Sequence, residues 1–295
     1  MEEPKAIINP SDFVTVTEMG KIIEIMHMEK MNTRAHIRKI SKTEYVELST
    51  GEIKEFKPTV TRAEGKNSLG KTFKKLRNLV NNNFSGRKNE LFVTLTFEPD
   101  PNKWRPMVGD TQYLAKACKE FQRKLRRKYG NVQFLRVLEP HADGHAHYHM
   151  LIRFDDFKHI FIPNEELNAM WGMGFVTIHS LKDVDNIGAY VSAYLTDIEF
   201  EEKTAINLMM SGEVVEVVEK EGKKYIKGGR LKYYPAGTQI YNKSKGILEP
   251  EKNRMSYKNA KKIVGSAKPH YTKIIDIENE DYKNTITYEQ YNLKR

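Results

Sequence analysis

Residues 139–149 read Glu-Pro-His-Ala-Asp-Gly-His-Ala-His-Tyr-His, and this stretch decides how two central strands pair. Side chains of a strand alternate between its two faces, so His145, His147 and His149 are expected to point the same way. Two imidazoles on one strand face make half of a divalent-metal site. Packing alone explains poorly why histidines at this spacing precede the apolar run over 150–152. We therefore predict a metal site on this strand.

The turn between the two strands decides whether Glu139 can join that site. A two-residue turn would direct Glu139 to the opposite face of the sheet, whereas a three-residue loop over 142–144 pairs it with His147. We expect the longer loop, with Gly144 left-handed and with Pro140 weakening the pairing. Glu139 is then the candidate third ligand, and the alternative is a strand carboxylate that faces solvent.

The segments around this hairpin predict an α+β fold. Apolar or alternating runs indicate strands over 91–97, 132–139, 145–154 and 175–178, and a charged hairpin over 213–227. Apolar side chains at helical spacing indicate helices over about 69–80, 111–129 and 184–197, the first capped by Ser68 and the second ended by Gly130. We expect a central antiparallel sheet of about five strands flanked by helices.

Along the chain, the patterns predict a division into three parts. A strand-rich lead-in covers 1–67, the main domain covers 68–250, and a lysine-rich tail or small subdomain covers 251–295. No stretch is long and apolar enough to cross a membrane, and the first residues do not resemble a secretory signal. The single cysteine, Cys118, excludes an internal disulfide and is expected to be a small buried side chain. These features predict a cytoplasmic protein.

The charge of the chain favours a polyanionic partner. Lys and Arg outnumber Asp and Glu by 49 to 39, which gives a formal charge of +10. An excess of this size attracts polyanions through long-range fields and counterion release. Two predicted helices concentrate the positive charge, where a contact with the DNA backbone competes with an ordinary solvated face. The candidate DNA-binding residues are Lys71, Lys74, Lys75 and Arg77 on the first helix and Arg123, Lys124, Arg126 and Arg127 on the second.

Tyr190 and Tyr194 are four residues apart in the third predicted helix and therefore share one of its faces. In a chain with 15 tyrosines such a pair is, by itself, more often packing. A tyrosine that attacks phosphorus needs a metal ion to draw charge from the phosphate oxygens. The metal site predicted on the preceding strand makes the two tyrosines candidate nucleophiles.

Three motifs occur in a fixed order: the apolar strand at 92–97, the run Glu-Pro-His-x-Asp-Gly-x-x-His-Tyr-His at 139–149, and the tyrosine pair. Together they resemble the HUH endonuclease superfamily in its two-tyrosine branch, which holds phage gene A-type replication proteins and plasmid or mobile-element initiators. A later stretch, 234–247, resembles the region after the tyrosine helix in Gram-positive initiators. The resemblance covers about 90–250. It implies a nuclease domain, placed here at 68–250, with an RRM-like (ferredoxin-like) core.

The resemblance also implies a role for each motif. His147 and His149 would bind Mg²⁺ or Mn²⁺ with Glu139 as third ligand, and Tyr190 and Tyr194 would be the nucleophiles. The protein would nick single-stranded or origin DNA to start rolling-circle replication, with a host helicase and polymerase as partners.

Further site residues are less well defined by the pattern. His141 and His145 are additional candidates beside the metal ligands. The family often has a lysine between or just after the tyrosines, but Ser192, Ala193, Thr196 and Asp197 fill those places here. Lys182, or a lysine from another segment, would have to serve.

Other functions use some of the same residues. A two-tyrosine transposase or a relaxase would use identical parts, although relaxases usually place their tyrosine before the histidines. A hydrolytic metallo-nuclease would use water as the nucleophile. A DNA-binding regulator without catalytic activity would use the histidines for structural zinc, but such sites usually have four ligands and favour cysteine. A covalent protein–DNA adduct would distinguish the first class from the other two.

Overall fold

The computed structural model describes residues 8–31, 35–41, 43–57, 61, 66–98, 100, 103–141, 143–181, 184, 186–193, 198–199, 217–220, 223–226, 230–279 and 282–294. The chain divides into two compact units. One unit comprises 60–249, and the other joins 1–59 to 250–295. Each unit has its own β-sheet, so the two are described separately.

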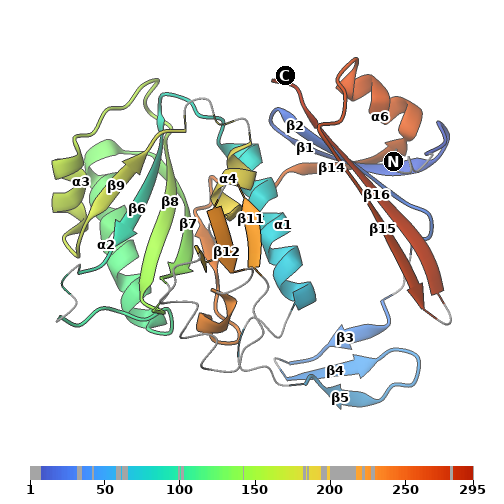
Figure 1. Ribbon diagram of the computed structural model, residues 1–295, viewed down its shortest axis with the longest axis horizontal. Coiled ribbons are helices and arrows are strands. Elements are labelled where there is room, and N and C mark those ends of the chain that lie inside the picture. The colour runs from blue at the N-terminus through green and yellow to red at the C-terminus, as the bar shows by residue number, and fades with distance from the viewer. Residues whose placement is uncertain are drawn as a thin grey trace. The chain divides into compact units, whose positions relative to one another are not determined.

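A five-stranded antiparallel sheet forms the centre of the unit over 60–249, in the order β13-β7-β8-β6-β9 (Figure 1). Its strands are β6 (Glu90–Thr96), β7 (Val132–Pro140), β8 (Ala146–Phe154), β9 (Val176–His179) and β13 (Tyr241–Lys243). The central strand β8 is buried at almost every position because helices cover both faces of the sheet. The expected α+β fold with a five-stranded antiparallel sheet is confirmed.

Two helices, α2 (Thr111–Tyr129) and α3 (Asn164–Trp171), cover one face of this sheet. Phe121 of α2 packs its ring 5.7 Å from that of Trp171, and the Trp171 indole donates a hydrogen bond to the Thr96 carbonyl. Cys118 of α2 is buried as expected, and burial raises the pKa of its thiol to about 11. These contacts tie both helices to the face that carries Tyr148.

The other face is covered by α1 (Lys66–Asn83) and α4 (Ile187–Ala193), which pack against each other. Gly188 allows the close contact, because a Cβ there would lie 2.6 Å from the Arg77 carbonyl oxygen. Its amide donates a hydrogen bond to the Asn81 side chain at 2.8 Å. The unit also holds a small sheet of β10 (Ile198–Glu199), β12 (Lys223–Ile226) and β11 (Val217–Lys220). The antiparallel pairing of the last two confirms the predicted charged hairpin.

The helix boundaries confirm one prediction and correct another. The second predicted helix runs from Thr111 to Tyr129 and ends at Gly130, whose φ of 72° suits glycine. The first begins at Lys66, so Ser68 lies inside the helix and the predicted cap is wrong. Neither of the two residues before Ser68 breaks a helix, which therefore extends toward the N-terminus. Of the third predicted helix, the described part runs from 187 to 193.

The second unit is built from both ends of the chain. Its five-stranded sheet has the order β14 (Glu251–Ser256), β1 (Phe13–Met19), β2 (Ile22–Met28), β16 (Tyr282–Asn292) and β15 (Tyr271–Asn279). The helix α6 (Tyr257–Val264) packs with these strands around a core that includes Val16, Ile25 and Tyr291. Sequence analysis treated 1–67 and 251–295 as separate parts. The difference arises because antiparallel pairing between distant segments leaves no local periodicity to detect.

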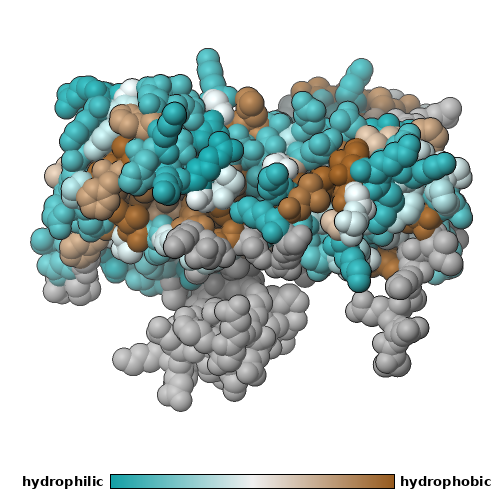
Figure 2. All heavy atoms as spheres, turned by 90° about the horizontal axis from the view of Figure 1, so that it is seen from above, coloured by the Kyte–Doolittle hydropathy of each residue, from teal (hydrophilic) through white to brown (hydrophobic). Residues whose placement is uncertain are grey.

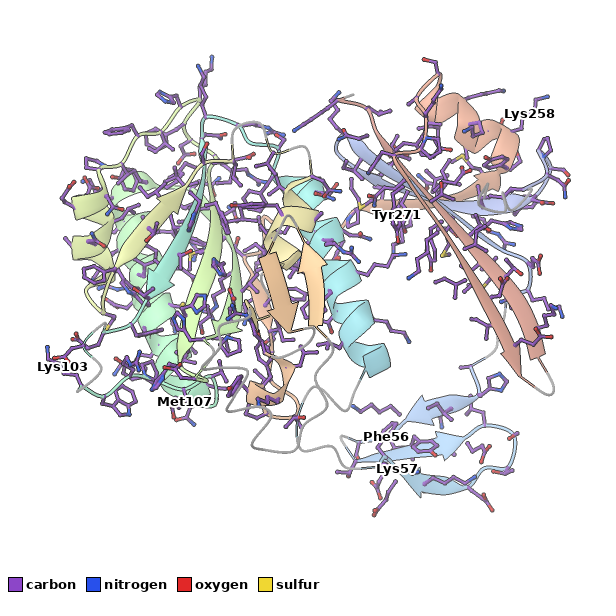
Figure 3. The ribbon with its side chains drawn as sticks, viewed as in Figure 1. Phe56, Lys57, Lys103, Met107, Lys258 and Tyr271 are labelled. Carbon is purple, nitrogen blue, oxygen red and sulfur yellow. The ribbon has the colours of Figure 1, made fainter. Side chains whose placement is uncertain are left out.

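A three-stranded sheet of β3 (Ile37–Lys39), β4 (Glu44–Glu47) and β5 (Ile53–Glu55) completes the N-terminal segment. The rings of Tyr45 and Phe56 pack 4.8 Å apart on it, with Phe56 labelled in Figure 3. Hydrophilic side chains cover much of the surface in Figure 2, as expected for a chain with 30% charged residues. Among the residues described, no helix has the length and apolar character needed to span a membrane.

Substitution of Gly188 by alanine is expected to destabilise the unit that contains it. The added methyl group would overlap the Arg77 carbonyl and the Asn81 amide of α1, and overpacking of this kind costs about 1–3 kcal/mol. Gly70→Ala is the matched control, since a Cβ at Gly70 meets nothing within 4 Å on an exposed helix surface. Thermal unfolding should give a lower Tm for Gly188→Ala and an unchanged or higher Tm for Gly70→Ala. Equal Tm values would show that the α1–α4 contact is loose.

Candidate metal centre

The β7–β8 hairpin places a carboxylate and two imidazoles on one face of the central sheet. Glu139 pairs with His147, and His141 forms the last contact before the turn by donating its amide to the His145 carbonyl. Gly144 has a φ of 85°. The predicted three-residue register is therefore confirmed, and Pro140 pairs within the strand rather than ending it early.

Three potential ligand atoms meet at one point. The Nε2 atoms of His147 and His149 are 3.2 Å apart, and the Oε2 of Glu139 lies 3.0 Å from the first and in close contact with the second. Two nitrogens that bind one ion at about 2.1 Å are separated by a similar distance. All three residues are buried. The cluster could hold a divalent metal ion, and it supplies the nitrogen and oxygen ligands that such ions accept.

Electrostatics keep Glu139 ionised at the centre of the cluster. Burial raises the pKa of this carboxyl, but the hydrogen bonds and charges of His147 and His149 outweigh burial and hold the pKa well below its ordinary value. The guanidinium of Arg230 lies 3.0 Å from the other carboxylate oxygen, Oε1. Arg230 therefore leaves one carboxylate oxygen directed at the two imidazoles.

The buried imidazole of His147 favours its neutral form. Burial lowers its pKa, although Glu139 opposes this effect. A metal ligand must present a lone pair, so an imidazole that stays neutral near pH 7 is ready to bind without first losing a proton.

A threonine links His149 to a second strand. The Thr94 hydroxyl lies 3.0 Å from Nδ1 of His149 and 2.7 Å from Nε2 of His179. The hydroxyl can therefore fix the ring orientation of His149 while Nε2 faces the cluster. Burial lowers the pKa of His179, and the nearby charge of His149 lowers it further.

Sequence analysis missed Thr94, His179 and Arg230. A threonine repeated at alternate positions of an apolar strand, 94 and 96, was the signal for the first. No local pattern marks the other two, because they reach the cluster from β9 and from the segment after β12.

The other predicted histidines lie beside the cluster rather than in it. The ring of His141 is centred 4.2 Å from that of His147, and burial lowers the pKa of His141 to about 4. Nδ1 of His145 lies 3.0 Å from the Asp143 carboxylate. Neither is part of the group of three that could share one ion.

The first predicted nucleophile lies on the same face of the sheet as the cluster. The Phe92 ring is centred 5.6 Å from His149 and 6.0 Å from Tyr190, so one aromatic ring contacts both. Phe92 and His149 share a face because Phe92 and Thr94 alternate along β6 and Thr94 pairs with His149. Tyr190 is half-buried. Tyr194 and Lys182, the other predicted residues near this helix, lie outside the described residues.

The predicted DNA-binding residues differ in how far they are engaged within the protein. Arg123 pairs with Glu120 at 2.6 Å, and Lys124 donates to the Met170 carbonyl at 2.8 Å. Lys75 lies 3.3 Å from Glu249. Of the remaining five, Lys74 is half-buried and the side chains of Lys71, Arg77, Arg126 and Arg127 are exposed.

These features define an α+β protein with a buried Glu-His-His site of the kind that binds divalent metals. Residues 90–199 match the model of a replication-associated protein family named for the protein ORF2. The matched stretch contains the three cluster residues and Tyr190, and the match is consistent with a rolling-circle replication initiator. Searches of curated proteins and of solved structures found no match.

Glu139→Gln should weaken metal binding at least tenfold, because an amide supplies no negative charge between the imidazoles. Isothermal titration calorimetry with Mn²⁺ would measure the Kd, and tenfold corresponds to about 1.4 kcal/mol. Glu120→Gln removes an exposed carboxylate of α2 that lies outside the cluster, and should bind Mn²⁺ like the unchanged protein. An unaltered Kd for Glu139→Gln would place the metal elsewhere.

Thr94→Val should also weaken Mn²⁺ binding, by about tenfold or more, through the loss of the hydroxyl that holds His149. Thr94→Ser keeps a hydroxyl and should restore affinity. The same calorimetric titration tests both variants. If valine and serine bind equally well, the hydroxyl has no orienting role.

Proposed function

We propose that the protein initiates rolling-circle replication by nicking one strand of origin DNA through a metal-dependent transesterification. Tyr190 and Tyr194 are the proposed nucleophiles, and Glu139, His147 and His149 the proposed metal ligands. The observation that carries the proposal is the common contact of the Phe92 ring with His149 and Tyr190. It brings a phenol and a metal-binding cluster to one sheet face, as a shared phosphodiester requires.

The proposed reaction exchanges one phosphodiester for another. The tyrosine oxygen forms a bond to phosphorus as the bond from phosphorus to the 3′ oxygen breaks. The phenol proton leaves to solvent, and the 3′ oxygen takes up a proton to become a free 3′-OH. When bound, a Mg²⁺ or Mn²⁺ ion supplies charge stabilisation at the non-bridging phosphate oxygens. The phosphotyrosine conserves the bond energy, so the reverse attack by a 3′-OH rejoins the strand without ATP.

The residues of the chain contribute to this reaction in separate ways. The ionised Glu139 and the neutral His147 are ready to bind a cation, as their lowered pKa values indicate. The hydroxyl of Thr94 orients His149. The role of Tyr194, which would resolve the displaced strand, rests on its spacing of four from Tyr190.

The surroundings of the reaction follow from its product. A free 3′-OH primes a polymerase, and extension needs the parental duplex to be opened, so a host helicase and polymerase are the proposed partners. We place the protein in the cytoplasm, where these partners and the DNA are found. The formal charge of +10 supports binding to DNA.

The double variant Tyr190→Phe with Tyr194→Phe should form no covalent adduct while it still binds DNA. The test incubates the protein with Mn²⁺ and a single-stranded origin oligonucleotide labelled at its 3′ end, then separates adducts under denaturing conditions. The unchanged protein should retain the label because it joins the 5′ phosphate of the labelled fragment.

Two controls separate this function from its competitors. His147→Ala should lose both cutting and adduct, since the cluster loses a ligand. Cleavage without adduct by the unchanged protein would indicate a hydrolytic nuclease, and binding without cleavage would indicate a regulator. An adduct that persists in the double variant would refute the assignment of the nucleophiles.

A further inference from the structure

The stretch over 241–247 has no part in the cluster, yet it shapes two cavities at the edge of the central sheet. One cavity, of about 590 Å³, lies between α2 and the sheet and is lined by Arg126, Arg136 and Lys245 among others. The second, of about 560 Å³, lies between α1 and the sheet and is lined by Lys75 and Tyr241 among others. Asn242 and Lys243 of the edge strand β13 line both cavities. The two cavities therefore adjoin on opposite sides of one short strand.

The lining of the cavities is cationic. Arg126, Arg136, Lys243 and Lys245 line the first, Lys75 and Lys243 line the second, and no acidic residue lines either among the described residues. The Nε of Arg136 is buried and has no hydrogen-bond partner among those residues. Arg126 lies over the Phe134 ring, 4.9 Å from its centre, which leaves the guanidinium edge able to donate. Such a surface suits the phosphates of a polyanion.

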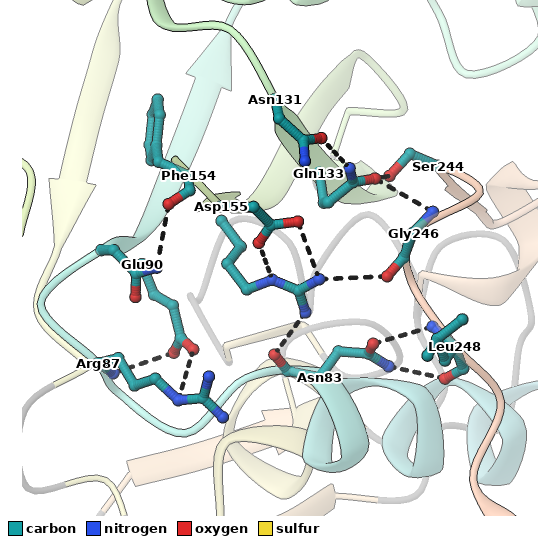
Figure 4. Close-up of polar contacts among 12 residues, drawn as sticks. Asn83, Arg87, Glu90, Asn131, Gln133, Phe154, Asp155, Ser244, Gly246 and Leu248 are labelled. Atoms are coloured by element: carbon teal, nitrogen blue, oxygen red, sulfur yellow. Dashed lines mark hydrogen bonds and ion pairs between the residues drawn. The ribbon is translucent and has the colours of Figure 1, made fainter. Parts of the chain in front are cut away.

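The wall of the first cavity is held in place by a hydrogen-bonded network. The Gln133 side-chain oxygen accepts from the Ser244 hydroxyl at 2.7 Å and from the Gly246 amide at 3.1 Å, as Figure 4 shows. The Gln133 amide donates to Asn131 at 2.7 Å. Arg153 donates to the Gly246 carbonyl at 3.2 Å. The loop that carries Lys245 is therefore fixed before any ligand binds, which lowers the entropic cost of binding.

The register of the sheet connects the second cavity to the metal cluster. Tyr241 pairs with Val137, which in turn pairs with His149, so Tyr241 lies on the cluster face of the sheet. Two strand spacings, about 10 Å, separate Tyr241 from His149. A strand that leaves the cluster toward this edge first meets Tyr241 and Lys75, and then crosses β13 to Lys245 and Arg126.

We propose that β13 and the loop after it form a track for single-stranded DNA, which runs from the cluster face around the sheet edge to the α2 side. The backbone phosphates contact Lys75 and Lys243 on one side and Lys245, Arg126 and Arg136 on the other. The identity of the strand rests on the proposed function, whereas the track itself rests on the cavities and their charges. The track gives the stretch over 241–247 a role separate from the chemistry of cutting.

One carboxylate opposes the track and provides a test of opposite sign. Glu249 lies 3.3 Å from the Lys75 amine and 3.8 Å from that of Lys243. It neutralises part of the lysine charge in the free protein and would repel a phosphate. Glu249→Gln should therefore tighten DNA binding, by about two- to fivefold at low salt.

The salt dependence of DNA binding tests the track directly. Fluorescence anisotropy with a labelled single strand of about 20 nucleotides, in EDTA so that no cutting occurs, gives Kd at several salt concentrations. Each phosphate contact on a single strand contributes about 0.7 to the slope of log Kd against log salt. Arg126→Ala combined with Lys245→Ala should lower the slope by about 1.4 and weaken binding about tenfold. Arg123→Ala, on the same helix but paired with Glu120, should leave the slope unchanged.

The outcomes separate the track from the proposed function. An unchanged slope in the double variant, or weaker binding by Glu249→Gln, overturns the track whatever the adduct assay shows. A reduced slope together with no adduct from the unchanged protein keeps the track and overturns the nicking function. Binding of Mn²⁺ to the double variant should match that of the unchanged protein, since neither side chain touches the cluster.

Discussion

The contact of one buried carboxylate with two imidazoles depends on the register of a single hairpin. Glu139 faces His147 because three residues, and not two, connect their strands. A change of one residue would turn the carboxylate to the α2 side of the sheet, since side chains alternate along a strand. The cluster, its hydrogen bonds to Thr94 and its ion pair with Arg230 all require this one pairing.

A second constraint acts across the helix layer. Tyr190 can lie near Phe92 because α4 packs tightly on α1, where Gly188 leaves room for the Arg77 carbonyl. Glycine disfavours a helix by about 1 kcal/mol relative to alanine, so its place inside a short helix indicates a packing requirement. The distance between phenol and cluster thus depends on a residue that touches neither.

The sequence predicts what local periodicity encodes. Alternation along β8 placed His147 and His149 on one face, and glycine chemistry at Gly144 selected the turn. Residues that arrive from distant strands escaped prediction, because nothing near Arg230 or His179 in the chain indicates that each approaches the cluster. The same limit hid the sheet formed by the two ends of the chain, whose strands lack a common local signal.

That terminal sheet has a consequence for synthesis on the ribosome. Strands β1 and β2 pair with β14 and β16, which come near the opposite end of the chain, so they remain without partners until the last strand has emerged. The unit over 60–249 contains all the strands of its own sheets and can fold earlier. Nascent chains should therefore acquire the cluster first, while the apolar strands over 13–28 await their partners and are open to chaperones.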